Sequence, residues 1–254
     1  MKIATWNVNS VKARQDRLLA WLRAKSPDVL CLQELKTTDE AFPRAEIEEL
    51  GYHAAVHGQK TYNGVAILSR TASTDVHIGM GDDENDPEAR IIAATIEGVR
   101  ILSIYVPNGK QTDSDKFNYK LRWLDRLQAY LERHDPQDAL CLCGDLNIAP
   151  GDSDVARPDE WKDSVLCVPQ VRERFERLLG WGLTDVFAAR NPEGGYYSWW
   201  DYRMLGFPKN NGLRIDHILA TKPLANRCTQ AVIDRQERKG KKPSDHAPVV
   251  ATFD

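Results

Sequence analysis

Short apolar runs rich in Val, Ile and Leu recur along the whole chain, and they constrain the fold more than any other feature of the sequence. Such runs, bounded by polar or turn-forming residues, are typical of buried β-strands. We therefore predict strands at residues 3–6, 29–32, 65–68, 91–96, 99–106, 139–143, 215–220, 228–233 and 249–253.

Three other segments have the spacing of amphipathic helices. Residues 11–25 place Val11, Leu18 and Leu22 on one side, residues 114–133 repeat leucines at helical spacing, and a third pattern lies near residues 169–179. No linker, repeat or low-complexity tract divides the chain. These features predict an α/β fold, formed as one domain over residues 1–254, with paired sheets inside and helices outside.

Composition places the chain among ordinary soluble proteins. No stretch approaches the roughly 18 apolar residues that a membrane helix needs, and the N-terminus reads directly into a strand without a signal segment. We expect a cytoplasmic protein that does not bind membranes. The five cysteines form no Cys-x-x-Cys pair, which predicts reduced, buried thiols.

The net charge of −3 conceals a local asymmetry. Residues 203–246 contain ten Lys and Arg against four Asp and Glu, whereas residues 81–90 contain five acids and one base. The first of these segments could therefore bind a polyanion, although the total charge argues weakly against non-specific nucleic-acid binding.

Oxygen-bearing side chains follow several of the predicted strands. A single such residue is usually a turn or a helix cap, but side chains from several strand ends can converge on one cation. An all-oxygen set suits Mg²⁺ or Mn²⁺ better than Zn²⁺. The segments are Asn7, Gln33-Glu34, Asp145 to Asn147, Asp216 and Asp245-His246.

The adjacent pair Asp245-His246 lies in a turn just before the last predicted strand. A histidine beside a carboxylate can be a general base held in one tautomer, a metal site or a capped turn. The pair by itself does not distinguish among these three roles.

The motifs, taken in order, resemble the exonuclease III class of apurinic/apyrimidinic endonucleases, within the endonuclease/exonuclease/phosphatase superfamily. They are Trp6 to Asn9, Leu32 to Lys36, Tyr105 to Gly109, Gly144 to Ile148, Leu213 to Asp216 and Ser244 to His246, supported by residues 52–68 and 198–203. The resemblance implies a four-layered α/β sandwich: two mostly antiparallel sheets packed face to face, with helices on both outer sides.

The resemblance also implies an activity, namely base excision repair by an Mg²⁺-dependent nuclease, with Mn²⁺ as a substitute. Such an enzyme hydrolyses the phosphodiester 5′ of an abasic site and leaves a 3′-hydroxyl, trims blocked 3′ ends, and in some members degrades duplex DNA from the 3′ end. The expected partner is double-stranded DNA containing abasic sites or blocked 3′ ends, and a monomer suffices.

Site residues follow from the same resemblance. Glu34 is expected to be the principal metal ligand, with the other ligands being Asn7, Asp145, Asn147 and Asp245. His246 is expected to be the general base or to contact the phosphate, oriented by Asp216. Asp145 would hold or activate the water, and Tyr105 and Asn147 would donate hydrogen bonds to the phosphate. Whether Asp145 or His246 takes the proton stays open, as does one metal versus two.

Residues 195–207 are the most aromatic segment. They are interpreted either as a core strand with a loop, or as a pocket and wedge that select a base-less nucleotide. In the second interpretation Trp199 forms the pocket with Leu213 and Ile215 opposite, and Met204-Leu205 is the wedge. The other expected DNA contacts are Lys60, Arg90, Asn108, Lys110, Trp200, Arg203, Lys209 and the basic run at residues 235–242, which could equally be a solvated loop.

Two other functions compete with the repair nuclease. One is a phosphoesterase acting on lipid or inositol phosphates, and the aromatic segment argues against it. The other is a nucleic-acid-binding regulator of the same fold without catalysis. The intact set of catalytic residues argues against this second alternative.

Overall fold

The computed structural model describes residues 1–84 and 86–254, and its strands form two six-stranded sheets. The first sheet has the order β11-β12-β1-β2-β4-β3, and its strands are β1 (Lys2–Asn7), β2 (Val29–Gln33), β3 (His53–His57), β4 (Val65–Ser69), β11 (Cys228–Ile233) and β12 (Val249–Phe253). The second has the order β5-β6-β7-β8-β10-β9, and its strands are β5 (Thr74–Ile78), β6 (Ile91–Ile96), β7 (Val99–Tyr105), β8 (Leu140–Asp145), β9 (Leu183–Asp185) and β10 (Asp216–Thr221).

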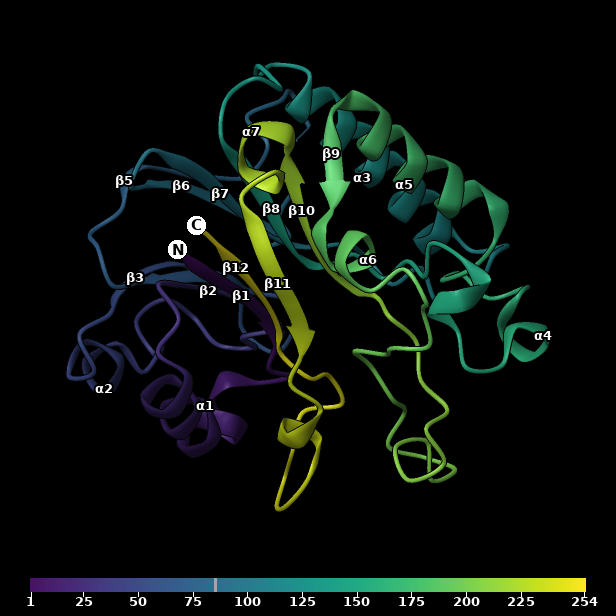
Figure 1. Cartoon of the computed structure of the whole chain (residues 1–254), viewed down its shortest axis with the longest axis horizontal. Coiled ribbons are helices and arrows are strands. Elements are labelled where there is room, and N and C mark those ends of the chain that lie inside the picture. Colours follow the sequence, from purple (N-terminus) through teal and green to yellow (C-terminus); the bar gives the residue numbers. More distant parts are fainter. Residues whose placement is uncertain (85) are drawn as a thin grey trace.

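Neighbouring strands are antiparallel except for two pairs, β1 with β2 and β7 with β8. Both sheets are therefore mostly antiparallel, as predicted. Helices cover their outer faces: α1 (Val11–Lys25) and α2 (Arg44–Glu48) lie on the first sheet, and α3 (Asp115–Leu131) and α5 (Pro169–Trp181) lie on the second (Figure 1). The shorter helices are α4 (Pro158–Trp161), α6 (Val186–Arg190), α7 (Lys222–Ala225) and the 3₁₀ turns Asp152–Asp154 and Arg235–Arg238.

Three apolar clusters hold these layers together, which confirms the predicted four-layered sandwich. The middle cluster joins the two sheets through residues such as Ile67 and Ile218, and it includes both Ile3 and Phe253 from the ends of the chain. The α-amino group of Met1 donates a hydrogen bond to the carbonyl of Phe253, so the termini lie side by side (Figure 1). All five cysteines are free and buried, as predicted.

The predicted strands and helices are confirmed, with ends shifted by at most a few residues. Three strands were missed. β3 reads His-Ala-Ala-Val-His, β5 is an edge strand exposed along its whole length, and β9 has three residues, so none presents a continuous apolar run. None of the described helices is long and apolar enough to cross a bilayer.

The strand directions bring the polar strand ends to one edge of the sandwich. The parallel pairs place the ends of β1 and β2, and of β7 and β8, on the same side. β10 runs antiparallel to β8 with Asp216 opposite Asp145, and β12 runs antiparallel to β1, so both begin at that edge. Side chains from both sheets therefore meet there.

Candidate active site

A groove of about 800 Å³ opens at this edge. Its walls come from the strand ends of both sheets and from three segments that lie far apart in the sequence, at residues 108–113, 161–166 and 199–203. Of the predicted catalytic and metal residues, those that line it are Glu34, Tyr105, Asp145, Asn147, Asp245 and His246.

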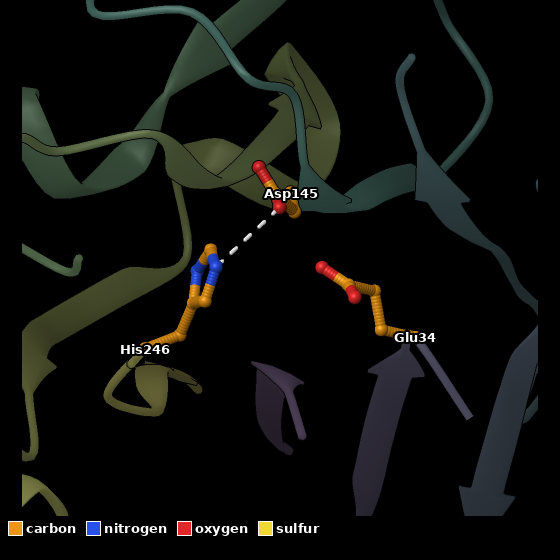
Figure 2. Close-up of side chains that lie close together, drawn as sticks. All are labelled: Glu34, Asp145 and His246. Atoms are coloured by element: carbon orange, nitrogen blue, oxygen red, sulfur yellow. Dashed lines mark ion pairs between the residues drawn. The ribbon is translucent and has the colours of Figure 1, made fainter. Parts of the chain in front are cut away.

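Glu34, Asp145 and His246, which all line the groove, point toward one another and form a compact group (Figure 2). One potential ligand atom from each lies within 4.8 Å of the others. Glu34 follows β2 with a left-handed backbone (φ 53°), Asp145 ends β8, and His246 precedes β12. Nε2 of His246 lies 3.7 Å from Oδ2 of Asp145.

The other ring nitrogen of His246 faces Asp216, which is fully buried at the start of β10. Nδ1 lies 2.9 Å from Oδ2 of Asp216, and the same oxygen accepts a hydrogen bond from the Ser198 hydroxyl at 2.6 Å. Indole Nε1 of Trp6 donates to the carbonyl of His246, which fixes the backbone of the turn. The imidazole is thus held between carboxylates on both of its nitrogens.

These carboxylates determine the protonation of the site. Burial lowers the pKa of His246, but the negative charges of Asp216 and Asp145 outweigh burial and raise the pKa to about 10. Burial also raises the pKa of Asp145 to about 7, with His246 opposing the shift and Asp216 adding to it. A neutral solution therefore favours an imidazolium at His246 and leaves Asp145 close to its titration point.

Each oxygen of the two carboxylates already accepts from or faces at least one protein donor. Amide Nδ2 of Asn7 donates to Oε1 of Glu34 (2.8 Å) and to Oδ2 of Asp145 (3.0 Å). Nζ of Lys36 lies 2.9 Å from Oε2 of Glu34, and the backbone N–H of Asn147 donates to Oδ1 of Asp145. The two carboxylates are thereby oriented toward each other from different sheets.

This donor set fits a hard divalent cation. Two carboxylates that converge in a buried recess repel each other unless a cation or a proton lies between them, and carboxylate oxygens are preferred ligands of Mg²⁺ and Mn²⁺. Because His246 is already engaged by Asp216, Glu34 and Asp145 are the two residues best placed to hold such an ion.

Asn7, predicted as a metal ligand, contacts both carboxylates of the group, and its ligand role stays a prediction. Its amide nitrogen, rather than its oxygen, faces the carboxylates, because Oδ1 accepts from the backbone N–H of Asn9. Asn7 is therefore a donor that orients Glu34 and Asp145.

Asn147 and Asp245 line the same groove, and their predicted roles as ligands stay predictions. The side-chain amide of Asn147 donates to the carbonyl of Val106 and accepts from Asn108. The carboxylate of Asp245 accepts from Asn9 and from indole Nε1 of Trp199. Both face the groove, but their polar atoms have protein partners in this conformation.

Tyr105 ends β7 and faces the two carboxylates. Burial raises the pKa of its phenol well above the usual value, and the charges of Glu34 and Asp145 add to this effect, so the hydroxyl keeps its proton. The Arg90 guanidinium stacks over the Tyr105 ring at 4.8 Å and donates to the Tyr105 carbonyl and to Glu88. Arg90 is largely buried and supports Tyr105 from behind.

The predicted DNA-contacting residues fall into three groups: those that line the groove, those exposed outside it, and those that are buried. Five line the groove, namely Asn108, Lys110, Trp199, Arg203 and Ile215. Lys60, Lys209 and Met204 are exposed outside it, and Met204, with 85% of its side chain exposed, lies at the tip of a loop with a left-handed backbone (φ 58°).

Several of the predicted DNA-contacting side chains, Arg90 among them, are buried in this structure, and their contact with DNA stays a prediction. Trp200 is fully buried and donates to Asn210, and Leu213 is fully buried in the core. Arg238, in the predicted basic run, is 6% exposed. Its guanidinium lies 5.0 Å from the centroid of the Phe207 ring, and the guanidinium of Arg235 lies 4.4 Å from the same centroid. The arginines of this run support the aromatic segment, whereas Lys239, Lys241 and Lys242 are exposed.

Sequence reasoning missed several residues of the site. Trp161 on α4 lines the groove and meets Trp199 edge to face, with ring centroids 5.8 Å apart. Ser198 supports Asp216, and Lys120 lies beneath the groove. Ser198 lies in the segment 198–203 that supports the resemblance. The sequence around Trp161 and Lys120 does not indicate a site, because only the fold brings α3 and α4 to this edge.

Comparisons with known proteins agree with this arrangement. Residues 4–246 match the family described as "Endonuclease/Exonuclease/phosphatase family". The chain is 40% identical to exodeoxyribonuclease III of Haemophilus influenzae, with both proteins covered completely.

Solved structures give the same result. An AP endonuclease from Archaeoglobus fulgidus superposes with a TM-score of 0.97 at 41% identity, covering 100% of this chain and 99% of that one. A 3′ phosphatase from Neisseria, solved bound to product DNA hairpin, superposes with a TM-score of 0.98 at 44% identity and the same coverage. The chain therefore belongs to the endonuclease/exonuclease/phosphatase family and, within it, to the exonuclease III class.

Proposed function

We propose that this protein is a DNA-repair nuclease that uses Mg²⁺ to hydrolyse the phosphodiester 5′ of abasic sites, leaving a 3′-hydroxyl, and that trims blocked 3′ ends. The observation that carries the proposal is the group of Glu34, Asp145 and His246 in the groove, with Asp216 behind the imidazole. The full-length likeness to exodeoxyribonuclease III supports the nuclease activity, and the likenesses to an AP endonuclease and a 3′ phosphatase support the two kinds of substrate.

The charges around the imidazole support a division of the proton transfers. Because Asp216 and Asp145 raise the pKa of His246, we assign its imidazolium to the phosphate, as a donor from Nε2. Asp145, with a pKa of about 7, is then the residue that accepts the proton of the attacking water. Tyr105, which keeps its proton, donates to the same phosphate.

Glu34 and Asp145 would hold the cation, and Asn7 would keep the two carboxylates aligned. When bound, Mg²⁺ supplies charge neutralisation for the phosphate oxygens. Mn²⁺ would substitute, since it accepts the same oxygen ligands.

DNA recognition is assigned to the rim of the groove. Trp199 and Ile215 would form the wall of a slot for the base-less nucleotide, and Asn108, Lys110 and Arg203 would contact the backbone. The exposed pair Met204 and Leu205 would act as the wedge. Lys60 and Lys209, both exposed, would bind phosphates farther along the duplex.

We also propose that residues 1–254 act as a single catalytic domain, because Ile3 and Phe253 share the apolar cluster between the sheets. A monomer is sufficient, since this one chain supplies every residue assigned above. Five free thiols suit a reducing compartment such as the cytoplasm.

One experiment tests the function. A duplex with a single abasic-site analogue is incubated with the protein in Mg²⁺ or in EDTA, alongside Asp145→Ala, and the products are resolved by gel. We expect a metal-dependent nick 5′ of the lesion with a 3′-hydroxyl, lost in Asp145→Ala.

Binding to the duplex without a nick would contradict the proposal and favour a regulator. Release of phosphate from an inositol phosphate in a parallel assay, with the duplex left intact, would favour the lipid or inositol phosphoesterase. A duplex ending in a 3′-phosphate, tested in the same way, measures the end-trimming activity.

A further inference from the structure

Lys120 is a lysine on α3 whose side chain is fully buried. Its Nζ donates three hydrogen bonds, to the backbone carbonyls of Asn147 (2.7 Å), Val165 (2.7 Å) and Asn108 (3.2 Å). Three acceptors require three N–H donors, which only the charged ammonium has. Burial lowers the pKa of Lys120 to about 7, with the charge of Asp145 opposing the shift, so the ammonium form is favoured below neutral pH. Burying an ammonium against neutral carbonyls is unfavourable for stability compared with an apolar side chain. The presence of a buried lysine at this position therefore calls for a role other than stability.

The three carbonyls belong to three separate walls of the groove. Asn108 lies in the loop after β7, Asn147 follows β8, and Val165 lies in the loop between α4 and α5; each of these residues lines the groove. Other hydrogen bonds also join neighbouring walls: Nδ2 of Asn108 donates to Oδ1 of Asn147, Nδ2 of Asn147 donates to the carbonyl of Val106, and the backbone N–H of Ala149 donates to the carbonyl of Leu166. Lys120 contacts all three walls through a single group.

The stem of Lys120 also approaches this loop closely. A Cβ atom added at Gly109 (φ 95°) would lie 3.2 Å from Cδ of Lys120 and from the Phe117 ring. The loop that carries Asn108 and Lys110 thus rests on the lysine stem, and its backbone turns at a glycine that leaves room for it.

We propose that Lys120 is a positioning residue of the nuclease, and that its ammonium fixes the spacing of the three walls around the reacting phosphate. The inference rests on the proposed function, because the reaction defines which geometry must be held. The ammonium is sealed from solvent, so it acts through Asn147 and the two loops, and does not itself bind the DNA backbone.

The test compares Lys120→Met, which keeps the length of the stem, with Lys116→Met, which removes an exposed charge one turn earlier on the same helix. With the abasic duplex and Mg²⁺, we expect kcat of Lys120→Met to fall about 10- to 100-fold with KM changed less than about threefold. Lys116→Met should keep the kcat of the unmodified protein.

Two further readouts separate positioning from other roles. The slope of log Kd against log salt should be unchanged in Lys120→Met, whereas Lys110→Met should reduce it by about one. Hydrogen exchange should become faster in residues 107–112, 146–150 and 163–167, with the rest of the chain unchanged.

An unchanged kcat together with a lower melting temperature would overturn the inference, since Lys120 would then only stabilise the fold. A rise in KM with a smaller salt slope would also overturn it, by showing a direct phosphate contact. If Lys120→Met does not fold, Lys120→Gln, which retains two N–H donors, replaces it with the same expectations. If the unmodified protein does not cleave, the proposed function fails, while the hydrogen-exchange comparison still tests whether Lys120 holds the three walls.

Discussion

His246 is held between two carboxylates from the second sheet, and its charge decides what it can do in the reaction. Asp216 faces Nδ1 at 2.9 Å and Asp145 faces Nε2 at 3.7 Å. Both favour the imidazolium, which is why the pKa of His246 rises to about 10 although the ring is buried. The resemblance led us to expect Asp216 as the residue that orients His246, while the neighbouring Asp245 accepts from Asn9 and Trp199.

The first prediction concerns this charge. Below a pH of about 10 His246 is protonated, and activity should fall as the pH rises through that value. Asp216→Asn removes the nearer carboxylate, so it should lower the pKa of His246 and move the alkaline limb of the kcat/KM profile to lower pH. A pH–rate profile of the mutant checks this, with the exposed Asp16→Asn as the control. An alkaline limb that stays in place would contradict the assigned charge.

The second prediction concerns the acid limb of the same kcat/KM profile, which we assign to Asp145. Because burial raises its pKa to about 7, the free protein should lose activity as the pH falls through that range. Bound Mg²⁺ favours the carboxylate form, so raising the Mg²⁺ concentration should move the acid limb to lower pH. Profiles at two Mg²⁺ concentrations measure the shift, and an acid limb independent of Mg²⁺ would argue against a cation beside Asp145.

Cation binding can also be measured without catalysis. Mg²⁺ or Mn²⁺ that binds only the folded protein stabilises it by about 2.7 kcal/mol at one hundred times its Kd. We expect the melting temperature to rise with Mn²⁺ in the unmodified protein and to rise much less in Glu34→Gln. Equal rises in both proteins would place the ion away from Glu34.

α3 illustrates how one element serves both stability and the site. Its apolar residues, such as Leu124 and Leu127, pack on the second sheet, while Lys120 on the same helix reaches under the groove. The leucine spacing predicted the helix, and Ser114 caps it: Oγ accepts from the backbone N–H of Phe117 at 3.2 Å. The same hydroxyl lies within hydrogen-bonding distance of the Gly109 carbonyl in the groove loop.

Removal of this cap gives a prediction for the element. Ser114→Ala should lower the free energy of unfolding by about 1 kcal/mol, because the helix loses its N-terminal acceptor. Ser114→Thr keeps an acceptor oxygen and should cost less. Urea denaturation of both variants measures the difference, and equal stabilities would show that the cap contributes nothing.

The whole molecule assembles the site across the interface between its two sheets. Glu34 and His246 adjoin strands of the first sheet, and Asp145 and Asp216 belong to the second. Their distances therefore depend on how the sheets pack, through the apolar cluster that contains Ile67, Ile101 and Ile218.

Ile218→Ala tests this dependence. Ile218 is fully buried between the sheets, so the change should lower the free energy of unfolding by about 2–5 kcal/mol. We also expect kcat to fall in protein that remains folded, because a cavity there loosens the spacing of the two sheets. Val232→Ala, at an exposed position of β11, is the control and should stay within about 0.5 kcal/mol. A stability loss with unchanged kcat would show that the site tolerates movement between the sheets.

The sequence by itself determined the strands and helices with strong periodicity, the family, and the identity of most polar residues at the strand ends. These are local properties, since an apolar run or a motif is legible without knowledge of its neighbours. Only the tertiary structure decided the partners of each side chain. It turned the nitrogen of Asn7 toward Glu34 and Asp145, paired Asp245 with Asn9 and Trp199, and buried Trp200, Leu213 and Arg238. It also placed Lys120 beneath the groove. The reason is physical: burial, charge and hydrogen bonding depend on segments far apart in the chain, such as Trp6 and His246, which are separated by 240 residues and meet only after the sheets have packed.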